Sequence, residues 1–165
     1  MKNLYLVRHA KSSWKLPIDD HKRPLKKRGV SDAILISGHI KDLVSKPDVL
    51  LTSDAERAKA TALYFKKAFN LESDSLFINK SLYDFQGKNV LRVIKELNDS
   101  FNVVMIVGHN HAFTSIVNML GDAIIKDLPT CGFIHIEFAI EHWKFANYGQ
   151  TKNVIFPRDL KYKNI

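Results

Sequence analysis

The sequence contains one cysteine, Cys131, in 165 residues. A lone thiol excludes a disulfide within the chain, which agrees with a reducing cytoplasm. The sequence also lacks an uninterrupted apolar run of about 18 residues, which a membrane-spanning helix requires. Arg8 breaks the apolar N-terminal run too early for a secretion signal. We therefore expect a cytoplasmic protein that has no membrane segment.

Two kinds of catalytic site lack the residues they need. A cysteine that attacks phosphate needs an arginine shortly after it in a phosphate-binding loop, and CGFIHIEF, which starts at Cys131, contains none. A zinc site needs spaced Cys, His and Asp ligands, whereas the histidines other than His109 and His111 are scattered. We therefore expect the Cys131 thiol to be buried or at a strand edge, and the protein to use neither a metal nor another cofactor.

The composition favours one domain. Apolar residues make up 45% of the chain, which at this length is enough to bury one substantial core. The sequence shows no internal repeat, low-complexity tract or linker. We expect residues 1–165 to form a single domain.

Three apolar runs are typical of buried strands, at residues 4–7, 49–51 and 103–107. Each run is followed by polar residues: Arg8 and His9 follow the first, Arg57 lies shortly after the second, and His109 follows the third. Ligands of open α/β sheets bind at the carboxyl ends of the strands. The sequence therefore predicts two arginines and two histidines at one edge of a sheet.

The intervening segments predict helices that alternate with these strands. Helical spacing predicts a helix that starts near Leu25 and carries the apolar residues at 33, 34, 36, 40 and 43. We also expect helices at 55–69 and 89–97, a helix at 113, strands at 76–78 and 133–138, and a strand around 143–146 that makes an antiparallel end. The basic tail from 157 to 165 is expected on the surface. The predicted fold is a three-layer α/β/α sandwich around a mostly parallel sheet.

Three segments of the sequence, LVRHAKSSW, TSDAERAKATA and VGHNHAF, resemble the signatures of the histidine phosphatase superfamily. The resemblance is greatest to its short branch, the SixA-like phosphohistidine phosphatases, and extends to HKRPLKKRG, LYDF and LPTCGFIHIEF. It implies a phosphoglycerate mutase-like fold. It also implies that His9 is the nucleophile, that Arg8 and Arg57 bind phosphate, and that His109 is the second histidine of the site.

The chemistry of phosphoryl transfer agrees with these roles. Transfer depends on positioning and on stabilising charge over the phosphoryl oxygens, which two arginines and a donating His109 supply without a metal. His9 must be neutral at its attacking nitrogen. We expect its other nitrogen to donate to a backbone carbonyl, which fixes the tautomer.

The chain departs from the family pattern at two places. His111 and Ala112 stand where branch members often carry Pro-Gly, so His111 is either a donor at the rim of the pocket or a rim residue without a catalytic part. Larger members use a glutamate as general acid, and Asp84 is the candidate here. Alternatively, Tyr83 packs and Asp84 starts the following helix. An imidazole leaves more readily than an alkoxide, so a phosphohistidine substrate needs less help from an acid.

Other polar residues near the predicted pocket have two interpretations each. Ser12, Ser13 and Asn110 are candidate substrate-binding residues because they follow the Arg-His and Gly-His strand ends. Ordinary turn capping explains the two serines equally well. Trp14 is expected to anchor its loop or form a wall of the pocket.

The chain is basic, with 25 Lys and Arg against 17 Asp and Glu. The segment HKRPLKKR at 21–28 could bind nucleic acid, steer a phosphorylated partner, or form a solvated helix face. It lacks interleaved aromatics and any recognisable nucleic-acid motif, so we do not expect a nucleic-acid partner. We expect the substrate to be phosphohistidine on a protein, because the chain has little room for capping insertions. The alternatives are a small phosphorylated metabolite or a module that binds phosphate without catalysis.

Overall fold

The computed structural model describes residues 1–162, whose strands form one six-stranded sheet in the order β3-β2-β4-β1-β5-β6. The strands are β1 (Lys2–Arg8), β2 (Val49–Thr52), β3 (Leu76–Ile78), β4 (Val103–Gly108), β5 (Phe133–Phe138) and β6 (Gln150–Ile155). The helices are α1 (Lys27–Ile40), α2 (Glu56–Ala68), α3 (Lys88–Lys95), α4 (Ala112–Leu120) and α5 (Pro157–Lys161). Short 3-10 turns are η1 (Asp20–Lys22), η2 (Ser73–Ser75), η3 (Lys80–Leu82) and η4 (Trp143–Phe145).

The sheet brings three strand ends to one edge. Strands β1 to β4 are parallel, whereas β5 is antiparallel to both of its neighbours, β1 and β6. The register sets Arg8 of β1 beside Gly108 of β4, and Thr52 of β2 beside Val107. The residues that follow β1, β2 and β4 therefore start from neighbouring positions.

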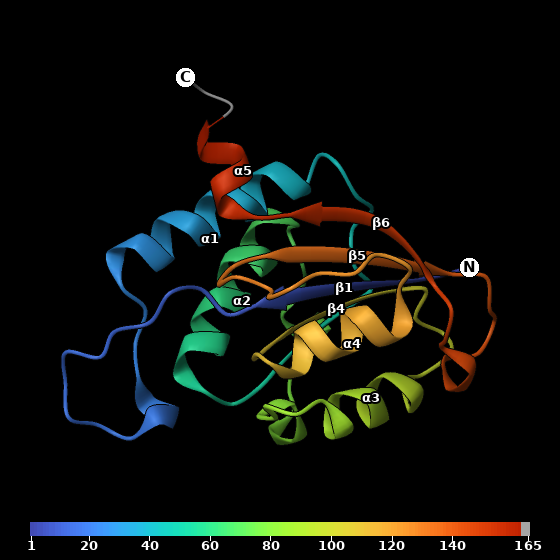
Figure 1. The fold of residues 1–165 in the computed structure, drawn as a ribbon, viewed down its shortest axis with the longest axis horizontal. Coiled ribbons are helices and arrows are strands. Elements are labelled where there is room, and N and C mark those ends of the chain that lie inside the picture. Colours follow the sequence, from blue (N-terminus) through green and yellow to red (C-terminus); the bar gives the residue numbers. More distant parts are fainter. Residues whose placement is uncertain (163–165) are drawn as a thin grey trace.

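Helices cover both faces of the sheet, so the fold has the three layers predicted from the sequence. Figure 1 shows α3 and α4 on one side of the strands and α1 and α2 on the other. Alternate residues of a strand point to opposite faces, and β1 serves both cores in this way. Its Leu4 and Leu6 pack in the core that contains Phe113 of α4, and Tyr5 and Val7 pack in the core that contains Phe65 of α2.

The predicted helices occur within a few residues of their expected bounds, but not all of the apolar residues of the first one are buried. Helix α1 begins at Lys27 rather than near Leu25. Its buried stripe runs through Ala33, Ile36 and Ile40. Ile34 lies off this stripe and is 57% exposed, and Leu43 follows the end of the helix and is 50% exposed.

The antiparallel end of the sheet is confirmed, but the strand expected around 143–146 is wrong. These residues form η4, where the indole Nε1 of the fully buried Trp143 donates to the carbonyl of Phe101. The outer partner of β5 is β6, which begins at Gln150, seven residues after Trp143. The apolar alternation around Trp143 therefore comes from the burial of one large side chain and does not mark a strand.

The tail is only partly a surface segment. Helix α5 buries Pro157 and Leu160, and Leu160 joins the core beneath α1 and α2. The last part of the expected tail, 163–165, lies outside the described residues. Within 1–162, every helix is too short or too polar to cross a lipid bilayer.

Candidate active site

His9 follows β1 directly and is 7% exposed. Its Nδ1 lies 2.8 Å from the carbonyl oxygen of Ala10, an atom that can only accept, so Nδ1 carries the proton. This contact confirms the expected backbone partner and leaves Nε2 unprotonated, so that its lone pair can accept from Nε of Arg57. The Nε of Arg57 lies 3.3 Å from that nitrogen.

Both imidazoles of the site are held neutral. Burial, assisted by the positive charge of Arg57 and Arg8, lowers the pKa of His9 to about 3. Burial and Arg57 lower the pKa of His109 to about 3 as well. A proton on either ring would lie in a poorly solvated region beside guanidinium groups, which explains the direction of both shifts.

Arg57 joins the two histidines. It lies in the first turn of α2 and is 2% exposed, and its Nη2 is 3.5 Å from Nδ1 of His109. The rings of His9 and His109 are 5.2 Å apart between centroids. Arginine can only donate, so Nδ1 of the neutral His109 accepts and its Nε2 donates to the hydroxyl of Ser53 at 2.7 Å. The neutral ring thus directs its N–H at Ser53.

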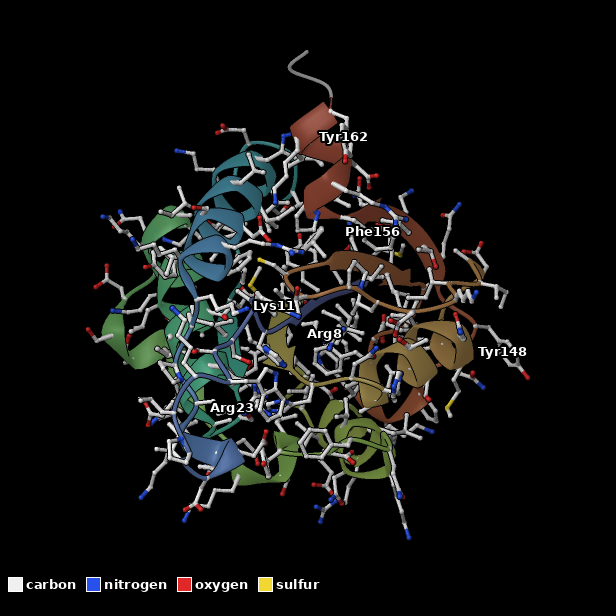
Figure 2. All side chains as sticks on the ribbon, turned by 60° about the vertical axis from the view of Figure 1, so that its left-hand side comes forward. Arg8, Lys11, Arg23, Tyr148, Phe156 and Tyr162 are labelled. Atoms are coloured by element: carbon white, nitrogen blue, oxygen red, sulfur yellow. The ribbon has the colours of Figure 1, made fainter. Side chains whose placement is uncertain are left out.

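Arg8 completes the group of four residues predicted from the sequence. Its Nη1 donates to the carbonyl of Leu128 at 2.8 Å, and its Nε is buried without a hydrogen-bond partner in the described residues. Burial lowers the pKa of Arg8, which still leaves the guanidinium charged at neutral pH. Figure 2 shows Arg8 near the centre of the molecule, where the N-terminal strand ends.

A cavity of about 200 Å³ opens at Arg8, His9 and Arg57, whereas the fully buried His109 lies behind its lining. It is lined by Arg8, His9, Ser12, Arg57 and Asn110 together with residues of the loop before α1 and the side chain of Phe85. Larger hollows flank α5, where no catalytic residue was predicted. The chemistry of its lining, and not its size, makes the smaller cavity the candidate site.

The loop before α1 brings in residues that the sequence reasoning missed. The carboxylate of Asp20 accepts from Nη2 of Arg57 at 2.9 Å, from Nε of Arg23 at 3.0 Å and from the hydroxyl of Tyr83 at 2.5 Å. Burial alone would raise the pKa of Asp20, but the hydrogen bonds from Tyr83 and Arg57 outweigh it and lower the pKa to about 2. The basic run at 21–28, which contains Arg23, was the only signal in the sequence for this part of the site, and none of its interpretations placed Arg23 at the cavity.

Asp84 takes the helix-start arrangement that the sequence left open. Its carboxylate accepts from the backbone N–H groups of Gln86, Gly87, Asn89 and Val90 at the beginning of α3. Burial raises the pKa of Asp84, but these backbone donors outweigh that effect and lower it. A carboxylate held in the ionised form is poorly suited to donate a proton.

The candidate substrate-binding residues separate into two groups. Ser12 and Asn110 line the cavity, but the Asn110 amide already donates to Asp127 and its carbonyl oxygen accepts from Thr114. The hydroxyl of Ser13 accepts from the backbone of Lys15, as a turn cap does.

Two further expectations concern side chains outside the cluster. The side chain of His111 is 81% exposed and lies 3.5 Å from Asp127, so it is on the surface beside the site. The Cys131 thiol is fully buried, and burial raises its pKa, so it cannot act as a thiolate nucleophile. Over the described part of the chain, no three His, Cys, Asp or Glu side chains are grouped closely enough to hold a metal ion.

The model of the histidine phosphatase superfamily, branch 1, matches residues 4–102. The chain belongs to the histidine phosphatase superfamily. An uncharacterized chloroplastic protein of Arabidopsis thaliana is 32% identical over 155 residues, covering 88% of this chain and 70% of the relative. An uncharacterized protein of Mycobacterium leprae is 31% identical over 163 residues, covering 91% and 98%.

Solved structures agree in fold. A protein of Agrobacterium tumefaciens described as a phosphohistidine phosphatase SixA has a TM-score of 0.80 at 25% identity, covering 94% of this chain and 98% of that one. The protein histidine phosphatase SixA complexed with tungstate has a TM-score of 0.82 at 19% identity, covering 96% and 99%. A mycobacterial glucosyl-3-phosphoglycerate phosphatase has a TM-score of 0.67 at 10% identity, covering 92% and 97%. The chain therefore has the phosphoglycerate mutase-like fold and is a phosphatase.

Proposed function

We propose that this phosphatase removes the phosphoryl group from phosphohistidine on a protein, and that His9 carries the group as an intermediate. The observation that carries the proposal is the state of His9. Its Nδ1 proton is fixed on the Ala10 carbonyl, and its unprotonated Nε2 lies at a cavity lined by Arg8 and Arg57, where it accepts from Arg57 until substrate takes that donor. A neutral, oriented imidazole between guanidinium groups is suited to attack phosphorus.

The reaction has two steps. In the first, the lone pair of His9 Nε2 forms a bond to phosphorus, and the bond from phosphorus to the substrate's nitrogen breaks. The electron pair of that bond goes to the departing imidazole, which takes up a proton from solvent. In the second step, water attacks the phosphorus on His9 and leaves its hydroxyl group there, while its proton returns to solvent. The nitrogen–phosphorus bond breaks, its electron pair returns to Nε2, and inorganic phosphate is released with His9 restored.

The surrounding residues have distinct parts in this scheme. Arg8 and Arg57 bind the oxygens of the phosphoryl group, where negative charge is concentrated. A bound dianion favours the protonated form of His109. Its Nδ1, which accepts from Arg57 in the free site, then becomes a donor to a phosphoryl oxygen as Arg57 turns to the phosphoryl group, while Nε2 keeps donating to Ser53. Asp84 is already engaged in starting α3, so we assign it no proton transfer.

The choice of phosphohistidine follows from the leaving group and from the size of the site. An imidazole leaves without the strong general acid that an alkoxide requires. The cavity, at about 200 Å³, can enclose a phosphoryl group and little more of a substrate. A protein side chain can present such a group while the rest of the partner stays outside.

The test compares substrates directly. Wild type, His9→Ala and His39→Ala are offered a phosphohistidine-bearing protein and a panel of sugar phosphates and other small esters. We expect turnover of the phosphoprotein in wild type and His39→Ala, whose changed histidine is exposed at the far end of α1. His9→Ala should lose at least about 10³-fold in kcat/KM, because no nucleophile remains.

Two results would count against the proposal. Rapid turnover of a metabolite with an untouched phosphoprotein would make the enzyme a small-molecule phosphatase. Full activity of His9→Ala would remove His9 from the chemistry. An acid-labile phosphoenzyme in wild type, missing in His9→Ala, would support the intermediate.

A further inference from the structure

We propose that Arg23 is a third phosphate-binding arginine, contributed to the site by the loop before α1. Arg23 is 6% exposed and lines the same cavity as Arg8, His9 and Arg57. Its Nη1 is buried and has no hydrogen-bond partner anywhere in residues 1–162. A charged donor of this kind is costly to bury unless it has an acceptor. A phosphoryl oxygen in the cavity would be that acceptor.

The position of Asp20 shows that Arg23 and Arg57 can hold one anion between them. One oxygen of the Asp20 carboxylate accepts from Nε of Arg23 at 3.0 Å, and the other accepts from Nη2 of Arg57 at 2.9 Å. The two guanidinium groups therefore lie at a spacing that a single oxyanion can bridge. Because Asp20 uses Nε of Arg23, the Nη1 end remains for a second anion.

Trp14 holds the Arg23 side chain in this position. The guanidinium carbon of Arg23 lies 3.4 Å from the centre of the Trp14 ring, a stacking distance. The contact covers one face of the guanidinium and leaves its edge, which carries the donors, free to hydrogen bond. The exposed Trp14 thus has a defined task, and Figure 2 shows that Arg23 comes from the loop on the α1 side of the molecule while Arg8 is central.

Three guanidinium groups match the three outer oxygens of a transferred phosphoryl group better than two. Charge spreads over all three oxygens in the transition state. Arg8 comes from the end of β1 and Arg57 from the first turn of α2, whereas Arg23 comes from the loop before α1. This inference requires the phosphatase site proposed above but not the identity of its natural substrate.

The experiment measures inhibition by inorganic phosphate of the hydrolysis of an aryl phosphate ester. The variants are Arg23→Met, Arg23→Lys and Arg28→Met. Arg28 is a matched control, because it lies five positions on, carries the same charge and has a side chain that is 67% exposed. We expect the inhibition constant to rise about 10- to 100-fold in Arg23→Met, since one charge-assisted hydrogen bond is lost. Arg28→Met should change it less than about 3-fold.

A double-mutant cycle separates phosphate binding from support of Asp20. If Arg23 binds phosphate, Arg23→Met weakens inhibition about 10-fold or more in the Asp20→Asn background as well. If Arg23 only holds the Asp20 carboxylate, the second change has no further effect and the proposal is overturned. An Arg23→Met result equal to that of Arg28→Met overturns it too.

The test remains decisive if one of the variants fails to fold. Far-ultraviolet circular dichroism checks each variant, and Arg23→Lys keeps the charge and the aliphatic stem if Arg23→Met fails to fold. Lysine cannot reproduce the Nη1 donor at the same place, so at least a several-fold rise is expected. Because the measurement uses phosphate and an aryl ester, inactivity of wild type on phosphohistidine would contradict the proposed substrate without affecting this result.

Discussion

His9 and His109 are neutral because the fold buries them beside permanent positive charge. A folded-state pKa of about 3 for each lies below the unfolded value near 6.5. Between these values the unfolded chain binds more protons than the folded one, so the free energy of unfolding rises with pH. The stability associated with each ring is fully present above about pH 6.5 and is lost as the pH falls toward 3.

This linkage gives a test on His9 alone. We expect wild type to lose about 2 kcal/mol more stability than His9→Gln between pH 7 and pH 5, since Gln does not titrate. Urea unfolding in phosphate-free buffer measures the difference. His39→Gln serves as the control, because the exposed His39 should leave the slope unchanged. An identical slope in wild type and His9→Gln would mean that folding does not lower the pKa of His9.

At the level of single residues, the sequence predicts the site residues at strand ends and misses those that a loop brings back to the site. Arg8 ends the buried strand β1, and His9 and His109 directly follow β1 and β4. The pairing of these two strands alone therefore brings the three residues together. Asp20 reaches Arg57 across 37 positions. Nothing in local periodicity specifies such a contact, because the path of the loop depends on packing that forms only in the complete fold.

At the scale of elements, the start of α3 depends on one carboxylate. Asp84 accepts from four backbone N–H groups, those of Gln86, Gly87, Asn89 and Val90. These are donors that a helix start otherwise leaves unpaired. The helix itself packs Val90 and Ile94 into the core, so loss of the carboxylate affects more than the loop.

We therefore expect Asp84→Ala to lower the free energy of unfolding by about 2–3 kcal/mol, while kcat on an aryl phosphate changes less than about 3-fold. Asp74→Ala, at an exposed carboxylate in η2, is the matched control and should stay within about 0.5 kcal/mol of wild type. Chemical denaturation and steady-state kinetics provide the two readings. Unchanged stability together with a kcat reduced by a hundredfold would instead identify Asp84 as the general acid.

Helices and strands were predictable where a long apolar pattern matched their burial. Strands β1 and β4 are buried along almost their whole length, and helix α2 has a regular buried stripe, so their positions follow from the sequence. Strand β6 has only half-buried and exposed residues, so its apolar signal is weak. Trp143 gave a stronger signal in the wrong place, because one large buried ring resembles a short strand when only hydrophobicity is considered.

The whole molecule carries a formal charge of +8 at pH 7, and part of this charge lies beside the site. Lys26 and Lys27 are exposed at the start of α1, which follows directly after the loop that lines the cavity. A cluster of one sign next to a site raises the rate at which oppositely charged partners arrive, and salt screens the effect. An acidic phosphoprotein would benefit more than a small ester of low charge.

We expect Lys26→Gln/Lys27→Gln to lower kcat/KM for an acidic phosphoprotein several-fold at low salt, with the difference vanishing at about 0.5 M salt. Hydrolysis of a small aryl phosphate should change little. Lys66→Gln/Lys67→Gln, which removes the same charge from the last turn of α2, is the control. Equal effects of the two double changes would show that net charge matters and that the place of the cluster does not.

The position of β1 in the sheet has a consequence for biosynthesis. His9, the proposed nucleophile, directly follows this strand, yet both partners of the strand come much later: β4 spans Val103–Gly108 and β5 spans Phe133–Phe138. A ribosome therefore exposes His9 early, long before any neighbour exists to hold it. Contacts between such distant positions form slowly, and the nascent chain has no ordered catalytic centre until most of it has been translated.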